Sequence, residues 1–99
     1  MVDSFLKHLQ FEKRFSTNTL LAYQTDLRQF EDFLSTTFPE FKSVSADYGV
    51  IRAWIVQLVE SEIDSLSINR KIACLRSYYK FLMRQEHIDK DPMGKIKVL

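Results

Sequence analysis

Residues 67–84 read SINRKIACLRSYYKFLMR, and this stretch carries the clearest signal of a helical fold. Its large apolar residues recur every three or four positions, at Ile68, Ile72, Leu75, Tyr79 and Leu82. Side chains at that spacing share one face of an α-helix, which is the face that a globular protein buries. Asp64 lies just before the stretch and can accept hydrogen bonds from the free amides of a helix start. We therefore expect an amphipathic helix from about Ser65 to Gln85.

Three further helices are expected from similar spacing. They should run from about Val2 to Lys13, from Thr17 to Leu34 and from Tyr48 to Ser61. The chain has only two glycines and two prolines, which is few for a β fold with many tight turns. With 99 residues, of which 45% are hydrophobic, it can bury one modest core. The sequence predicts an all-α fold, a single bundle of four main helices.

The end of the chain, HIDKDPMGKIKVL, has a different character. Pro92 and Gly94 interrupt helix, and the lysines of this segment favour solvent. We expect a helical domain over residues 1–88 and an exit linker over residues 89–99.

Residues typical of catalytic or metal sites are scarce. His8 and His87 lie far apart, and the single cysteine, Cys74, falls within the last helical pattern, where a small buried thiol is the usual role. Two glycines cannot build a phosphate-binding loop. We expect no cofactor, no metal site and no enzymatic activity of this chain by itself. No apolar run approaches the ~20 residues that cross a bilayer, so we expect a cytoplasmic protein without membrane association.

Charge is distributed unevenly along the chain. Residues 1–64 carry six Lys and Arg against ten Asp and Glu, whereas residues 65–99 carry eight against three. Within the basic part, Ser67, Arg70, Lys71 and Cys74 follow i, i+3, i+4, i+7 spacing and form a second stripe beside the apolar one. A basic stripe near a helix start suits entry into the major groove of DNA, and we expect this stripe to face outward. The same residues could instead form an ordinary solvated face.

Two stretches resemble a known family. FSTNTLLAYQTDLRQFEDFL at residues 15–34 and SINRKIACLRSYYKFLMR at residues 67–84, followed by Asp91-Pro92-Met93, are similar to the core-binding domain of Xer-type and phage-integrase tyrosine recombinases. The resemblance covers essentially the whole chain in order. It implies a SAM-like integrase N-terminal domain, a helical bundle that forms one arm of a clamp around double-stranded DNA.

The resemblance also implies which residues meet the DNA. In that family the second and fourth helices lie on the duplex, near the major groove. Carried over by position, the DNA-binding residues are Asn18, Thr19, Ser67, Asn69, Arg70, Lys71, Cys74 and Arg76. Arg70 is the best candidate for readout of a base or phosphate. Arg76 could equally support packing or an ion pair.

Cleavage chemistry in the family belongs to a downstream catalytic domain, toward which residues 89–99 would lead. That domain supplies a His-x-x-Arg pair and a nucleophilic tyrosine. Neither histidine here is followed by arginine at that spacing, and the four tyrosines lie in helical patterns. The resemblance implies other recombinase protomers as partners of the full-length protein, and we expect the isolated domain to be a monomer. An alternative is a helical protein-interaction module that uses its acidic first half and does not bind DNA.

Overall fold

The computed structural model describes all 99 residues, and it contains four α-helices and no strands. The helices are α1 (Val2–Phe11), α2 (Thr17–Thr37), α3 (Tyr48–Glu60) and α4 (Ser65–Arg84). The predicted all-α fold with four main helices is confirmed. For three of the four helices, both predicted ends lie within two residues of the observed ends. The exception is α2, which continues three residues beyond Leu34, almost to Pro39. No helix combines the length and apolarity that crossing a membrane requires.

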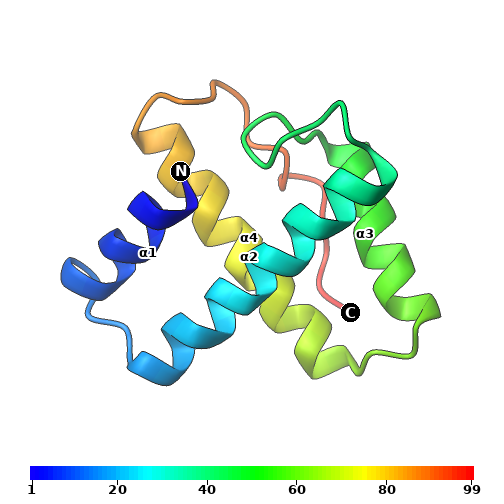
Figure 1. Ribbon diagram of the computed structural model, residues 1–99, viewed down its shortest axis with the longest axis horizontal. Helices are drawn as coiled ribbons and strands as arrows, with labels where there is room; N and C mark the ends of the chain where they lie inside the picture. Colours follow the sequence, from blue (N-terminus) through cyan, green and yellow to red (C-terminus); the bar gives the residue numbers. More distant parts are fainter.

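Helices α2 and α4 cross at the centre of the molecule, with α1 on one side of the crossing and α3 on the other (Figure 1). Each of the outer helices packs against both α2 and α4. The five residues of the predicted apolar stripe on α4 are all fully buried, so that prediction is confirmed. Burying a large apolar side chain contributes about 1.5–3 kcal/mol, so α4 is the main source of core stability.

Three helix starts are capped by side chains. The Ser16 hydroxyl accepts from the backbone N–H of Thr19 at 3.2 Å, and the Asp64 carboxylate accepts from that of Ser67 at 2.8 Å. The Asp64 cap was expected from the sequence. Asp47 adds a third cap by accepting from the backbone N–H of Val50 at 3.0 Å. These bonds fix where α2, α3 and α4 begin and where their remaining free amides point.

The C-terminal tail (residues 89–99) packs against the bundle along part of its length. Met93 and Ile96 are only 3% and 6% exposed and belong to the hydrophobic core. The guanidinium of Arg76 donates a hydrogen bond to the backbone oxygen of Ile96. Met93 and Ile96 thus anchor this segment to the bundle, and its role as an exit linker stays a prediction.

Candidate nucleic-acid interface

Helices α2 and α4 begin at the same edge of the molecule, the lower edge in Figure 1. A helix start carries backbone N–H groups without partners and a partial positive charge, and both features attract phosphate. Two starts at one edge therefore give the fold a surface suited to a polyanion. This surface is called the α2/α4 edge below and comprises residues 16–19 and 64–70.

The start of α2 offers neutral polar groups. Asn18 is exposed, and Thr19 is partly exposed. The Ser16 hydroxyl donates to the Thr19 hydroxyl at 3.0 Å while it caps the helix. With no carboxylate in its first turn, this helix start keeps its full attraction for an anion.

The start of α4 carries a negative charge, that of its capping residue Asp64. Asp64 accepts from both the backbone N–H and the hydroxyl of Ser67, at 2.8 and 3.0 Å. These hydrogen bonds hold the pKa of the Asp64 carboxyl below its usual value, so it is ionised at neutral pH. The carboxylate offsets part of the positive end of α4. Phosphate is therefore better accommodated at the start of α2 than at that of α4.

Arg70 is the exposed cation of this edge, and a buried acid braces it. Its Nε and Nη2 atoms donate to the two carboxylate oxygens of Asp26, at 3.1 and 2.8 Å. Hydrogen bonding to Asp26 raises the pKa of Arg70 further. A guanidinium has five N–H donors, of which Asp26 takes two. The remaining donors lie on the Nη1/Nη2 side, and 43% of the side chain is exposed, so a phosphate or a guanine edge can still be bound there.

Lys71 lies inside the protein. It is 6% exposed, and its ammonium group donates to Asp26 at 2.8 Å and to Gln29 at 2.7 Å. The prediction that Lys71 faces outward with Arg70 is therefore wrong. The predicted basic stripe borders the apolar stripe of α4 directly. Helix α2, which packs on the apolar stripe, therefore also covers Lys71. With Asp26 the two cations form a cluster of net charge +1, whose exposed member is Arg70.

Cys74 is buried, which confirms the expectation of a small buried thiol and shows that the expectation of an outward position on the basic stripe is wrong. Its thiol lies 3.7 Å from the backbone oxygen of Tyr23 on α2 and is fully shielded from solvent. Burial and the nearby Asp26 raise the pKa of the thiol far above its ordinary value, so the thiolate does not form at neutral pH. The residue serves as a small packing element where α2 crosses α4.

Asn69 and Arg76 hold the C-terminal tail. The Asn69 side chain donates to the backbone oxygen of Leu99 at 3.2 Å and accepts from its backbone N–H at 2.8 Å. Arg76 reaches Ile96 from one side of the tail, as described above. The sequence left two roles open for Arg76, contact with DNA or support of the fold. Its hydrogen bond to the tail favours support of the fold. Among the eight predicted site residues, Asn18, Thr19, Ser67 and Arg70 remain available at the α2/α4 edge.

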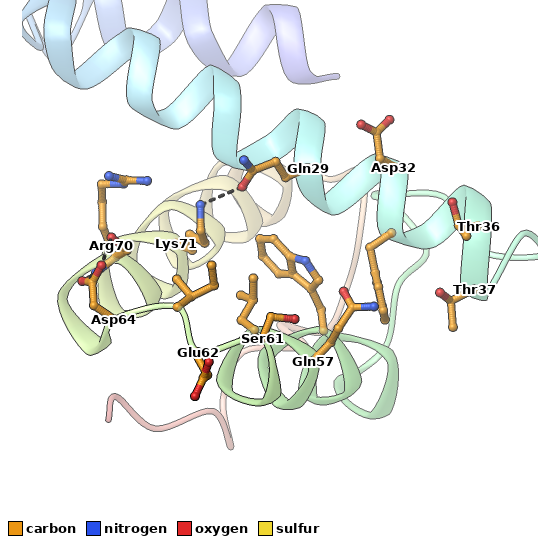
Figure 2. A pocket seen from close by; sticks show the side chains of 15 residues that line it. Gln29, Asp32, Thr36, Thr37, Gln57, Ser61, Glu62, Asp64, Arg70 and Lys71 are labelled. Atoms are coloured by element: carbon orange, nitrogen blue, oxygen red, sulfur yellow. Dashed lines mark hydrogen bonds between the residues drawn. The ribbon is translucent and has the colours of Figure 1, made fainter.

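Figure 2 shows the hollow that adjoins Arg70, a cavity of about 710 Å³ between the second half of α2, the end of α3 and the start of α4. Trp54 forms part of its wall, and the dashed line marks the bond from Lys71 to Gln29. Three carboxylates line the hollow, those of Asp32, Glu62 and Asp64. Arg70 and Lys71 also line it, so the side chains of the lining carry a net charge of −1, and phosphate is better accommodated at the start of α2.

Sequence reasoning missed the residue that organises this cluster. Asp26 is 1% exposed, yet it lies between Tyr23 and Leu27 in the apolar pattern of α2. The available signal was the position of Asp26, three residues after Tyr23 and next to Leu27, which places an acid on the apolar face of the helix. A carboxylate buried there requires a cationic partner. Leu66 was missed too. It is 83% exposed at the start of α4, where an apolar side chain can meet a thymine methyl group.

Comparison with known proteins places the chain in a family. Residues 2–86 match the family described as phage integrase, N-terminal SAM-like domain. The chain belongs to this integrase family. The SAM-like all-α class that the sequence predicted is thereby confirmed.

Curated relatives of this integrase-family domain are tyrosine recombinases. Tyrosine recombinase XerC of Halalkalibacterium halodurans is 37% identical over 92 residues, which are 92% of this chain and 30% of the relative. Tyrosine recombinase XerD of Rickettsia bellii is 34% identical over 96% of this chain and 30% of the relative. Tyrosine recombinase XerD of Shewanella oneidensis is 36% identical over 98% of this chain and 32% of the relative. The chain spans about a third of the length of these relatives. No solved structure matches it.

Proposed function

We propose that this integrase-family domain binds duplex DNA through its α2/α4 edge and positions the catalytic domain of a longer tyrosine recombinase. The observation that carries the proposal is Arg70, an exposed cation braced by a buried carboxylate between two helix starts. A braced guanidinium loses little side-chain entropy on binding, because its rotamer is already fixed. Asn18, Thr19 and Ser67 add hydrogen-bonding groups on either side of it.

In this proposal the chain grips DNA and leaves strand cleavage and rejoining to the rest of the longer protein. The support is the family and the relatives, which are tyrosine recombinases about three times as long as this chain. Residues 89–99 would lead toward the catalytic domain, and the full-length protein would meet other recombinase protomers on the DNA. Site-specific recombination or integration of DNA is the reaction that the domain would serve.

The proposal predicts weak, salt-sensitive binding by the isolated chain. Contacts to phosphates dominate non-specific affinity, and a small number of them gives a Kd of about 10⁻⁴–10⁻⁶ M at physiological salt. Fluorescence anisotropy with a labelled mixed-sequence duplex measures this affinity directly. Arg70→Ala should weaken binding by about 1–3 kcal/mol, roughly 5-fold to 150-fold, while the circular dichroism spectrum stays helical.

Arg52 provides the matched control, because it is an exposed arginine on α3, outside the α2/α4 edge. Arg52→Ala should leave the affinity for the duplex almost unchanged. Equal losses for the two variants would mean that only net charge matters, and the assigned face would be wrong. Absence of binding at low salt would favour the alternative, a protein-interaction module.

A further inference from the structure

A second surface of the molecule is a groove between α3 and the C-terminal tail, whose last residue, Leu99, is bonded to Asn69 of the α2/α4 edge. Its cavity measures about 460 Å³, and six of the ten residues that line it are hydrophobic. The tail runs beside α3 here, with its end held by Asn69 (Figure 1). We call this surface the α3–tail groove; its lining residues used below are Tyr48, Arg52, Val56, Val59, Lys95 and Lys97.

Helix α3 is apolar on the side that faces this groove as well as on the side that faces the core. Its inner face is buried through Ile51, Trp54 and Leu58. Its outer face presents Tyr48, Val56 and Val59, all of them exposed, and Val59 is 49% exposed. A helix that packs on one side only normally places polar residues on the other side. The outer apolar stripe of α3 is not needed for the bundle and fits contact with a partner.

Three cations surround this apolar stripe. Arg52 comes from α3, and Lys95 and Lys97 come from the tail. All three are exposed, and none of them forms an ion pair. Glu60 is the single acidic side chain of the lining, so the side chains of the groove carry a net charge of +2. A complementary ligand is apolar along its centre and acidic along its flanks.

We propose that the α3–tail groove binds an acidic amphipathic helix of a partner protein. The stripe from Tyr48 to Val59 covers eleven helical steps, or about 16 Å, which matches about three turns of a bound helix. Apolar side chains at i, i+3, i+4 and i+7 of the partner would contact the stripe, and its carboxylates would meet the three cations. Duplex DNA is a poorer occupant, because the apolar floor offers its phosphates no donors.

The proposal is tested with a fluorescein-labelled synthetic peptide of about four turns, with leucine at the i, i+3, i+4 and i+7 positions and glutamate flanking them. A scrambled peptide of the same composition serves as the reference. The 99-residue chain should bind the ordered peptide at least about tenfold more tightly than the scrambled one. In ¹H–¹⁵N spectra the amides of residues 48–60 and 95–98 should shift, and those of residues 16–19 and 64–67 at the α2/α4 edge should not.

Val59→Glu places a carboxylate in the groove at a position where the fold tolerates it, and it should weaken peptide binding at least about tenfold. Leu66→Glu is the matched control, since it makes the same change at an exposed leucine of the α2/α4 edge. It should leave peptide binding unchanged and weaken DNA binding, whereas Val59→Glu should do the reverse. Failure of one proposal is thus distinguishable from failure of the other.

Three results would overturn the groove proposal. The first is equal affinity for the ordered and scrambled peptides, which would indicate non-specific charge attraction. The second is unchanged peptide binding by Val59→Glu. The third is a shift of the groove amides on adding duplex DNA, or on raising the protein concentration alone, which would assign the groove to DNA or to a second copy of the chain.

Discussion

Removal of the Asp26 carboxylate should destabilise the domain severely, because it leaves a buried ammonium group without its counter-charge. In Asp26→Ala, the Lys71 side chain remains 7% exposed, with the amide oxygen of Gln29 as its remaining partner. Breaking a buried ion pair by removing one partner costs about 3–5 kcal/mol. Small domains have a total stability of about 5–15 kcal/mol, so the loss is a large part of the whole.

The assay is urea and thermal unfolding followed by circular dichroism. For a domain of this size 1 kcal/mol corresponds to about 4–8 °C in Tm, so the melting temperature should fall by at least about 12 °C. Asp32→Ala is the matched control, because Asp32 lies on the same helix but is exposed and forms no ion pair. Its effect should stay within about 0.5 kcal/mol.

A double-variant cycle isolates the cause. Lys71→Met removes the buried cation, after which the loss of Asp26 strands only Arg70, which solvent can reach. The Asp26→Ala change should therefore cost about 2–3 kcal/mol less in the Lys71→Met background than in the natural chain. Additive costs, or a loss below about 1 kcal/mol for Asp26→Ala alone, would mean that the ion pair between Asp26 and Lys71 does not stabilise the domain.

Further predictions concern the tail and the start of α4. Ile96→Ala should cost about 2–4 kcal/mol in urea unfolding, as expected for a core residue, and a loss below about 0.5 kcal/mol would mean that the tail is a free linker. Asn69→Ala should speed amide hydrogen exchange at Leu99 without changing DNA affinity; unchanged exchange would contradict the assigned tail contact. Asp64→Asn keeps a capping acceptor but removes a negative charge, so DNA binding at low salt should tighten a few-fold in anisotropy, whereas weaker binding would contradict the electrostatic argument. Hydrogen bonds from Ser67 lower the pKa of Asp64 in the folded chain. The stability that this cap contributes is therefore complete above the ordinary pKa of 3.8 and is lost as the pH falls through the lower folded pKa. Acid unfolding of Asp64→Asn should lack this pH-dependent loss.

The helices were predictable from the sequence because their signals are local. Apolar spacing set the inner stripe of α4, and short polar residues before α2 and α4 set their caps. Each of these features is set by residues three or four positions apart along the chain. The tail was harder to predict, because Met93 and Ile96 are isolated apolar residues whose partners lie far away in the sequence.

The candidate site was predictable only in part. Periodicity alone could place Arg70 and Lys71 beside the apolar stripe, but it could not tell which of two adjacent cations the second helix covers. That depends on where α2 crosses α4, and Asp26 lies 44 and 45 residues away from the two cations it binds. Pairing over such a separation leaves no local trace except an acid within an apolar pattern.

Titration of the ¹⁵N-labelled chain with duplex DNA at low salt would locate the DNA-binding surface, which we propose to lie at the starts of α2 and α4. We expect progressive amide shifts at residues 16–19 and 64–70, reversed by added salt, with residues 48–60 unaffected. Shifts that cluster on α3 or α1 while the α2/α4 edge stays silent would contradict this assignment.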